Sequence, residues 1–545
     1  MMAVILLLSV AIFVLAYIVY GRFLDRRFDV DPNRPTPSHA DYDGVDRVPA
    51  HRAVLLGHHF SSIAGAGPIV GPVIAATAFG LLPAFLWILV GAVLIGGVHD
   101  YASLMASVRH RARSIADIAR EHMSPLAYKL MLAFIFLALV YVLTVFADLT
   151  STTFVQDGGV ASSSLMFMAL AVAFGATVYR AKLGVLRASL VFVPLVFVAV
   201  WAGHRLPLPA NEIPVWPGGT PAKTWNVLLM GYCFAASVTP VWILLQPRDY
   251  LSSFLLYGSL LGGVIGILAG GFVIQAPVFT GWENPQLGAM FPILFITVAC
   301  GACSGFHSIV ASGTSSKQID RESDARLVGY GSMLIEGVVA VIALATVALL
   351  VKDDPMLKQA PLQIYGAGMG RFLAVLGLPE AVGKSFGLLA LSTFILTTLD
   401  TATRLNRYVF EEFFHLKGKN MRYLSTAATL VLPTVFVLIT LHDKNGAPIP
   451  AWKAIWPVFG ATNQLLAGLA LIVVAVWLRR TGRPAGFIIV PVVFMVAVTL
   501  WALVLLIRQY GLQPIGLIAI VLMALSVVVL VEAARALLRG KPAAL

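Results

Sequence analysis

Two adjacent histidines and a glycine-proline break interrupt an apolar segment of this chain, GHHFSSIAGAGPIVGP (residues 57–72). Imidazole titrates near neutral pH, so His58 or His59 could carry a proton through a membrane. Adjacent residues do not share one helical face, so we expect at most one of the two to face a transport pathway. The alternative is a histidine that is hydrogen-bonded to a neighbouring carbonyl. The same segment offers oxygen atoms that suit a hard cation, from Ser61, Gly65, Ala66, Gly67 and Pro68.

A second group of polar residues lies in SGFHSIVASGTSS, residues 304–316. Its hydroxyls and imidazole are predicted to bind an ion or substrate, and the residues concerned are Ser304, His307, Ser308 and Ser312. A cation could lie between Ser308 or Ser312 and the carbonyls of residues 65–67, or a proton on His307 could replace it. Hydroxyl residues also mediate ordinary helix packing in membranes, which is the alternative.

Two cysteines precede this histidine on the same predicted helical face. Cys300, Cys303 and His307 follow i, i+3, i+7 spacing, and thiolate with imidazole could bind zinc. Three ligands on one helix rarely complete a tetrahedron without outside help. We therefore predict no metal and no cofactor, other than a coupling ion.

Charged residues inside apolar segments are costly and are functional candidates by default. Asp100 and Glu336 are possible proton carriers, because a carboxyl group in low dielectric can hold a proton near neutrality. Asp400 and Arg404 have the i, i+4 spacing of a helical ion pair, which favours a structural or gating role. Arg248 could form a gate with Asp100, although topogenic charge is the simpler explanation. Asn463 is expected to bridge helices.

Composition indicates a membrane protein. Hydrophobic residues make up 59% of the chain and charged residues 12%, with a mean hydropathy of +0.88, and soluble domains carry about twice that charged fraction. There is no GxxxxGK[ST] phosphate loop and no HExxH motif, so we predict no enzymatic activity. The net charge of +12 matters here through its distribution, and no nucleic-acid partner is predicted.

Apolar runs of about 20 residues predict an all-α polytopic protein with about 15 transmembrane helices. The expected ranges are 2–20, 53–79, 81–108, 126–147, 161–179, 184–203, 225–245, 251–275, 289–311, 329–351, 380–403, 423–441, 454–477, 484–507 and 513–537. Most of the 38 basic residues fall in alternate loops, which predicts the N-terminus outside and the C-terminus inside. The first span has no cleavage site and its positive cluster follows it, so it is expected to be a retained anchor.

Two spans with helix-breaking residues each open a run of five helices. The first, 53–79, enters from the cytoplasm, and the second, 225–245, enters from outside and contains Thr239 and Pro240. Paired interrupted helices are typical of inverted-repeat transporters, where they hold substrate and coupling ion. The expected organisation is an N-terminal helix and cytoplasmic loop (1–52), repeat 1 (53–203), repeat 2 (225–403) and additional C-terminal helices (423–545).

Five motifs carry a family resemblance: GHHFSSIAGAGPIVGPVIAA, VTPVWILLQPRDYLSSF, SGFHSIVASGTSSKQI, TTLDTATRLNRY and PVFGATNQLLAGLAL. Together they resemble the carbon starvation protein A (CstA) family over roughly residues 52 to 470. The resemblance implies an inner-membrane transporter, with peptide uptake during carbon starvation proposed for some members and proton-coupled pyruvate uptake for others. It also implies the five-plus-five inverted-repeat fold of the amino acid-polyamine-organocation superfamily, with extra flanking helices.

These observations together predict a secondary active transporter in the bilayer of the inner membrane. We expect it to import small peptides in the starvation response, coupled to H⁺ or Na⁺, by alternating access at two broken helices. A proton symporter of pyruvate or another short monocarboxylate is the first alternative. A membrane sensor or metal-binding protein without net flux is the second. Oligomeric state is left open by the sequence.

Overall fold

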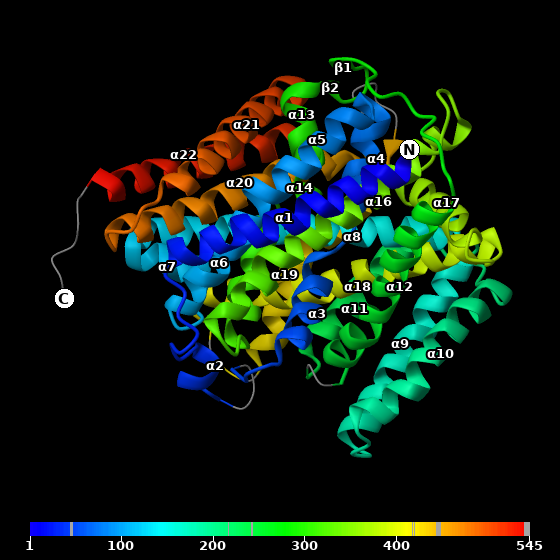
Figure 1. Ribbon diagram of the computed structural model, residues 1–545, viewed down its shortest axis with the longest axis horizontal. Coiled ribbons are helices and arrows are strands. Elements are labelled where there is room, and N and C mark those ends of the chain that lie inside the picture. The colour runs from blue at the N-terminus through cyan, green and yellow to red at the C-terminus, as the bar shows by residue number, and fades with distance from the viewer. Residues whose placement is uncertain are drawn as a thin grey trace.

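The computed structural model describes residues 1–43, 47–215, 217, 219–240, 243–416, 418, 420–442 and 448–538. Helices dominate the chain, and most of the long ones run side by side in one bundle (Figure 1). Most of them follow the apolar runs of the sequence, and α10, α19, α20 and α21 continue through an internal proline. The long helices are α1 (Met2–Phe28), α5 (Leu81–Gly91), α6 (Gly97–Arg109), α8 (Pro125–Gln156), α9 (Gly158–Tyr179), α10 (Val185–Arg205), α11 (Pro221–Val238), α12 (Leu245–Ala269), α16 (Ser332–Ala348), α18 (Glu380–Phe413), α19 (Met421–Leu438), α20 (Ala451–Arg480), α21 (Gly486–Tyr510) and α22 (Pro514–Leu538).

Shorter elements connect or interrupt this bundle. The helical ones are α2 (Pro37–Ala40), α3 (Arg52–Ile63), α4 (Gly67–Phe79), α7 (Ile115–His122), α13 (Met290–Thr297), α14 (Ala299–Ala302), α15 (Gly305–Gly313) and α17 (Pro361–Ala374), with the 3₁₀ turns η2 (Ser315–Lys317), η3 (Glu322–Asp324) and η5 (Pro355–Lys358) and the π-helical turns η1 (Ala92–Gly96) and η4 (Arg326–Gly331). Strands β1 (Glu283–Asn284) and β2 (Gly288–Ala289) pair antiparallel, as do β3 (Leu441–His442) and β4 (Pro448–Ile449).

Twelve helices in the described residues are long and apolar enough to cross a membrane, and the bent pair α3–α4 adds a thirteenth span. The polytopic all-helical class predicted from hydropathy is therefore confirmed. Two of the fifteen predicted spans have a different form. Segment 225–245 is not one broken span, because α11 ends at Val238 and α12 starts separately at Leu245. Segment 289–311 is not one helix, because it is divided into α13, α14 and α15.

The centre of the bundle is formed by α8, α18 and α20. The apolar part of α20 is buried along its full length, and that of α18 nearly so. Helix α20 packs on α8 and on the divided segment α13–α15. The segment predicted as an additional C-terminal helix, 454–477, therefore lies in the core, whereas α9 and α10 form a hairpin at the edge of the bundle (Figure 1).

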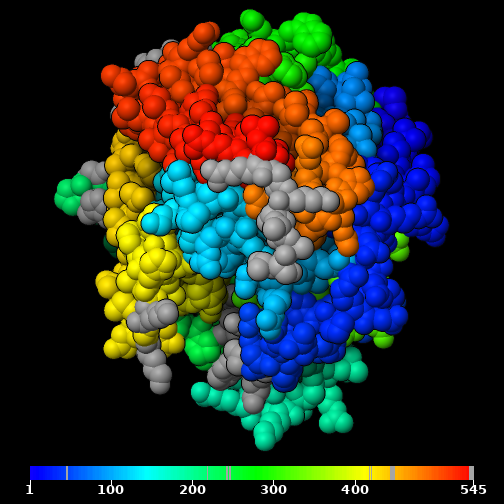
Figure 2. All heavy atoms as spheres, turned by 90° about the vertical axis from the view of Figure 1, so that its left-hand side faces the viewer, coloured from blue at the N-terminus to red at the C-terminus, as the bar shows by residue number. Residues whose placement is uncertain are grey.

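Several loops that were expected in the cytoplasm meet at one end of the bundle. Glu322 accepts hydrogen bonds from Arg109 Nε at 2.6 Å and from Arg34 Nη1 at 3.1 Å. Arg483 Nη1 donates to the carbonyl of Phe28 at 2.7 Å. Figure 2 views this end of the molecule, where the blue N-terminal segment lies beside light-blue and orange parts of the chain. Four predicted loops, separated by hundreds of residues, thus share one surface.

Candidate functional site

The first broken helix follows directly from its sequence. Helix α3 ends at Ile63, Ala64 leaves the helical region with ψ of 66°, and α4 starts at Gly67 with Pro68 in its first turn. Proline lacks an N–H and suits a helix start, where no intrahelical acceptor is available. The two halves are bent by 47°. The predicted break is confirmed, and residues 61–68 are all buried.

A second break lies opposite the first, between α14 and α15. Cys303 and Ser304 are extended there, with φ of −166° and −117°. Asn463 on α20 stabilises this break, because its Oδ1 accepts from Phe306 N at 2.9 Å and its Nδ2 donates to Ser304 Oγ at 3.0 Å. Asn463 therefore bridges helices, as predicted, and replaces the missing helical partner of a buried N–H.

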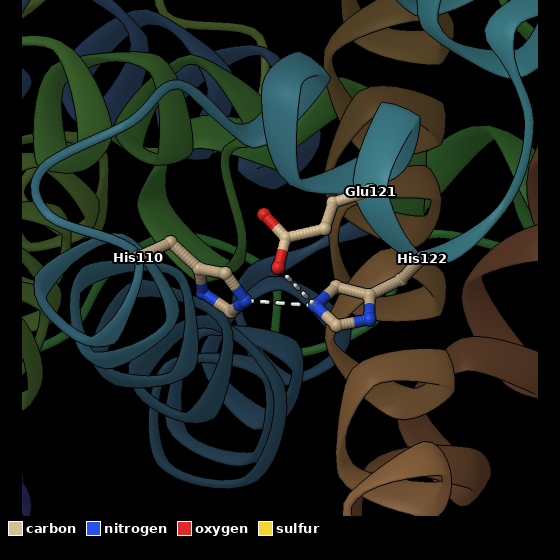
Figure 3. A group of neighbouring side chains, drawn as sticks. All are labelled: His110, Glu121 and His122. Atoms are coloured by element: carbon tan, nitrogen blue, oxygen red, sulfur yellow. Dashed lines mark hydrogen bonds and ion pairs between the residues drawn. The ribbon is translucent and has the colours of Figure 1, made fainter. Parts of the chain in front are cut away.

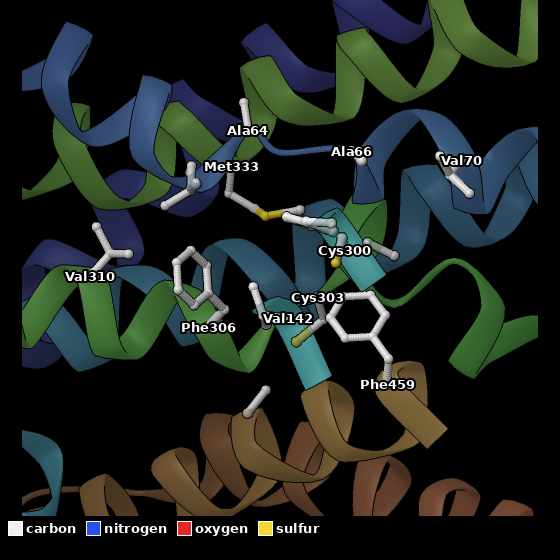
Figure 4. Close-up of a cluster of buried hydrophobic side chains, with 14 of the residues drawn as sticks. Ala64, Ala66, Val70, Val142, Cys300, Cys303, Phe306, Val310, Met333 and Phe459 are labelled. Carbon is white, nitrogen blue, oxygen red and sulfur yellow. The ribbon is translucent and has the colours of Figure 1, made fainter. Parts of the chain in front are cut away.

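The two breaks touch each other, as Figure 4 shows for the linker from Ala64 to Ala66 and the neighbouring Cys300. A Cβ atom added at Gly67 would lie 2.2 Å from Cys300 Cβ, and one added at Gly71 would lie 2.5 Å from the carbonyl oxygen of Thr297. Gly71 therefore packs against the backbone of residues 297 and 298, where only glycine fits, and Gly67 packs against the Cys300 side chain. The half-helices are therefore held in direct contact.

Replacing Gly67 with alanine is expected to destabilise the protein by about 1–3 kcal/mol or more, because the added methyl overlaps Cys300 in a packed interior. The measurement is the melting temperature of the purified protein in detergent. Gly231→Ala is the matched control, since an added Cβ at Gly231 meets nothing within 4 Å. Equal melting temperatures for both variants would contradict the close contact.

Four titratable side chains form a buried line beside the second break. Asp100 on α6 lies between two imidazoles, with Oδ1 2.8 Å from His99 Nδ1 and Oδ2 2.7 Å from His307 Nδ1. The opposite ring nitrogen of His307, Nε2, lies 3.3 Å from Glu336 Oε2 on α16. All four side chains are fully buried. The structure therefore brings together three predicted residues, Asp100, His307 and Glu336.

These distances favour one arrangement of protons. An ionised Asp100 is satisfied when both imidazoles donate from Nδ1, which leaves a lone pair on His307 Nε2 facing Glu336. A buried carboxylate without a donor costs several kcal/mol, and neither oxygen of Glu336 has a hydrogen-bond partner among the described residues. Glu336 is therefore best satisfied as a carboxylic acid that can pass its proton to His307.

The two histidines of α3 have different surroundings. His59 is fully buried, and its Nδ1 lies 2.7 Å from Ser315 Oγ. His58 is partly exposed, and its Nδ1 lies 3.9 Å from Asp249 Oδ2. His59 Nε2 and Ser61 Oγ are buried with no hydrogen-bond partner in the part of the chain that is described. The two adjacent imidazoles thus point into different surroundings, and which of them faces a transport pathway stays a prediction.

Three predicted hydroxyls are engaged locally. Ser308 and Ser312 donate to carbonyls of their own helix, those of Gly305 and Ser308, each at 2.7 Å, and Ser304 pairs with Asn463. A hydroxyl that the sequence did not single out lies at the first break instead. A Cβ added at Gly65 would lie 3.0 Å from Thr398 Oγ1 of α18, which is buried and without a partner in the described chain.

Cys300, Cys303 and His307, which share i, i+3, i+7 spacing, contact different partners. Cys300 Sγ accepts from Asn463 Nδ2 at 3.1 Å, Cys303 Sγ lies 3.8 Å from Met495 Sδ, and His307 faces Asp100. Thr239 and Pro240 lie at the end of α11, half-buried and exposed respectively. No contact joins them to the break at residues 64–66 among the interactions described.

Arg248 and Asp400 correct two local predictions. Asp400 pairs with Arg248 of α12 and not with Arg404, whose Nη2 donates to the carbonyls of Ala236 and Thr239 at 2.9 and 2.8 Å. Arg248 is fully buried, so it is neither a topogenic surface charge nor a partner of Asp100. Tyr232 OH donates to Asp400 Oδ2 at 2.8 Å, and Asp249 Oδ1 lies 3.1 Å from Arg248 Nη2.

A narrow pocket opens beside the first break. Its volume is only about 10 Å³, room for about one water-sized sphere. It is lined by Ala64 and Gly65 of the linker and by residues of α4, α12, α16, α17 and α18. Its polar lining includes Ser259 Oγ and Tyr365 OH, which lie 3.1 Å apart. Most of its wall is apolar. The pocket lies beside the first turn of α4, where Ile69 forms part of its wall.

The carbon starvation protein CstA family matches residues 1–356 and 352–502. The chain belongs to this family. It is 32% identical to the peptide transporter CstA of Escherichia coli, over 91% of this chain and 79% of that protein. It is 34% identical to the peptide transporter CstA of Mycobacterium tuberculosis, over 89% of this chain and 73% of that protein. It is 30% identical to the pyruvate/proton symporter BtsT of E. coli, over 91% of this chain and 80% of that protein.

A solved manganese transporter of Eremococcus coleocola is similar at a TM-score of 0.48 and 15% identity, over 91% of this chain and 99% of that chain. Family membership and the apolar spans make this chain a multi-pass integral protein of the inner membrane. Its family relatives are transporters, which agrees with the predicted transport role.

Proposed function

We propose that this chain is a proton-coupled secondary transporter that imports small peptides during carbon starvation. The observation that carries the coupling is the line Asp100, His307, Glu336, in which a buried carboxyl faces the free nitrogen of an imidazole. Ionisable groups at such depth mark proton relays in membrane transporters. The peptide transporters of the same family support the substrate class.

Alternating access is proposed to occur around two inverted repeats whose limits differ from those expected from the sequence. Repeat 1 consists of residues 52–156 and 221–269, and repeat 2 of residues 290–348 and 380–480. The breaks α3–α4 and α14–α15 open them, and each has a π-helical turn in its second span, η1 and η4. In this proposed arrangement segment 225–245 does not open a repeat, unlike in the arrangement expected from the sequence, because α11 and α12 are separate helices.

Matched packing contacts support this assignment. Helix α4 packs on α16 as α15 packs on α6. Helix α3 packs on α12 as α13 and α14 pack on α20. Helix α12 packs on α18 as α20 packs on α8. An internal two-fold relation produces such pairs, and substrate sites lie at the interface of the repeats. The shared surface of the basic loops supports an N-out, C-in orientation. Helices α1, α9, α10, α21 and α22 flank the repeats.

The proposed substrate site is the region beside Gly65, where the narrow pocket would have to widen to admit a dipeptide. The N-terminus of α4 carries a partial positive charge that would favour a carboxylate. Ser259 and Tyr365 supply hydroxyls. A peptide and pyruvate share the carboxylate, and the 30% identity to a pyruvate/proton symporter makes pyruvate or a related monocarboxylate the second candidate.

Uptake by purified protein in proteoliposomes tests the function. Labelled dipeptide and labelled pyruvate are offered with an inward proton gradient, an inward sodium gradient or neither. We expect the dipeptide to accumulate only with the proton gradient. Accumulation of pyruvate alone would assign the second substrate. No flux of either solute through correctly inserted protein would favour a sensor or metal-binding role without transport.

The variant Thr398→Val distinguishes between H⁺ and Na⁺ as the coupling ion. The buried Thr398 hydroxyl beside Gly65 is the group that a sodium ion at the first break would use, and it is not part of the proton line. We expect the valine variant to keep its dependence on the proton gradient. Val has nearly the volume of Thr, so a large loss of gradient-driven uptake with unchanged melting temperature would instead favour sodium coupling.

A further inference from the structure

Three potential metal ligands meet outside the bundle core, at the junction of α6 and α7. His110 caps the end of α6, and Glu121 and His122 lie at the end of α7. Their ligand atoms all lie within 4.8 Å of one another. Figure 3 shows the three side chains pointing into the same space, with His110 coming from one side and Glu121 and His122 from the other.

The backbone fixes the form of His110. Its Nδ1 lies 2.6 Å from the carbonyl oxygen of Ala106, and since a carbonyl only accepts, Nδ1 carries the proton. A neutral His110 therefore presents the lone pair of Nε2. A histidine that donates its second nitrogen to a carbonyl is the usual arrangement at metal sites, because it sets the tautomer and the ring orientation.

The lone pair of His110 is aimed at the second histidine. His110 Nε2 lies 2.8 Å from His122 Nε2, and Glu121 Oε1 lies 3.8 Å from the same atom of His122. Two imidazole nitrogens that bind one tetrahedral zinc at 2.0–2.1 Å lie about 3.3 Å apart. The two nitrogens would thus have to move apart by about half an ångström to admit the ion. Rotation of the side chains can supply this movement.

The surroundings hold the imidazoles in place and leave a way in for solvent. His110 packs edge-on against Trp477, with ring centroids 5.2 Å apart. The Glu121 side chain is 46% exposed. In Figure 2 the light-blue part of the chain that contains α7 reaches the molecular surface.

Nearby charges narrow the choice of ion. Arg113 Nη1 donates a hydrogen bond to the other carboxylate oxygen of Glu121 at 3.0 Å. The positive charge of Arg480 also acts on His122. With one carboxylate partly neutralised, the site is poor for Mg²⁺ and Ca²⁺, which need several oxygen ligands. Two imidazoles and a single carboxylate oxygen suit Zn²⁺ and similar transition metals.

We propose that His110, Glu121 and His122 bind one divalent transition metal ion, such as Zn²⁺, with water as the fourth ligand. The ion would tie the end of α6, the helix that carries Asp100, to α7 and so to the start of α8. This site is separate from the proton line and does not depend on the proposed transport function.

Metal binding to the full chain, purified in detergent without a polyhistidine tag, tests the proposal. Zn²⁺ is titrated in competition with a chromogenic chelator, and Co²⁺ is added as a spectroscopic probe. We expect one site per chain, the visible absorption of tetrahedral Co²⁺, and a higher melting temperature with Zn²⁺. The double variant His110→Gln with His122→Gln is expected to lose the site, and Glu121→Gln to weaken it at least about tenfold.

His204→Ala, at an exposed histidine that contacts Ser385, is the matched control and should bind as the wild type does. Glu121→Gln covers the case in which the double variant fails to fold, because Glu121 is a surface side chain. A wild-type protein that gives no tetrahedral Co²⁺ absorption would overturn the proposal. So would unchanged zinc affinity in Glu121→Gln or in a folded double variant.

Discussion

Replacing Glu336 with glutamine is expected to reduce the accumulation ratio of substrate in proteoliposomes to about one, because a transporter whose coupling free energy is zero can only equilibrate its substrate. The carboxamide keeps the shape of the side chain but cannot hand a proton to His307 Nε2, 3.3 Å away in the native protein. Exchange of labelled for unlabelled substrate, which needs no net proton movement, should persist. The measurement is uptake with and without an inward proton gradient.

Two companion variants sharpen this prediction. His307→Gln interrupts the same line between Asp100 and Glu336, so it should also lose accumulation. Glu212→Gln changes an exposed glutamate and should accumulate substrate as the wild type does. Full proton-driven accumulation by folded Glu336→Gln would remove Glu336 from the coupling mechanism, whatever the substrate.

The second large effect is expected at the ion pair between Arg248 and Asp400. Both side chains are fully buried, and removing one partner of a buried pair leaves an uncompensated charge at a cost of about 3–5 kcal/mol. Asp400→Asn leaves Arg248 with Asp249 as its remaining carboxylate, and offers Tyr232 OH a neutral amide oxygen in place of a carboxylate. We expect a clearly lower melting temperature in detergent.

A double-mutant cycle isolates the pair. Arg248→Met combined with Asp400→Asn should be less destabilised than the two single variants predict together, because the double variant leaves only Asp249 without its partner, whereas Arg248→Met alone leaves both Asp249 and Asp400 without theirs. Asp353→Asn is the matched control for the charge change, since Asp353 is exposed and its positive φ suits asparagine. Additive losses in the cycle would contradict a direct interaction between Arg248 and Asp400.

Local sequence signals located the first break but not the second. Glycine and proline at residues 65–68 interrupt a helix by their own chemistry, so the break was predictable. The break at Cys303 and Ser304 contains no proline, and the cap on Phe306 comes from Asn463, distant in sequence. The Thr239–Pro240 signal was real but separates two complete helices.

For the charged residues, burial could be predicted from the sequence but pairing could not. Burial of Asp100, His307, Glu336 and Asp400 could be predicted from their apolar surroundings. Their partners could not, because i, i+4 spacing suggested Arg404 for Asp400, whereas the fold brings Arg248 to it from a helix far away in sequence. Spacing within a helix also could not reveal that Asp100 and Glu336 flank one imidazole, since three separate helices supply them.

Proton movement driven by substrate is the most direct measure of coupling. Proteoliposomes containing a luminal pH dye receive an inward gradient of the transported substrate, with no proton or sodium gradient imposed. Because coupling is reciprocal, we expect the lumen to acidify as substrate enters, and Glu336→Gln to abolish the acidification without blocking exchange. Substrate entry into wild-type vesicles with no change of luminal pH would contradict proton coupling through the buried line Asp100, His307 and Glu336.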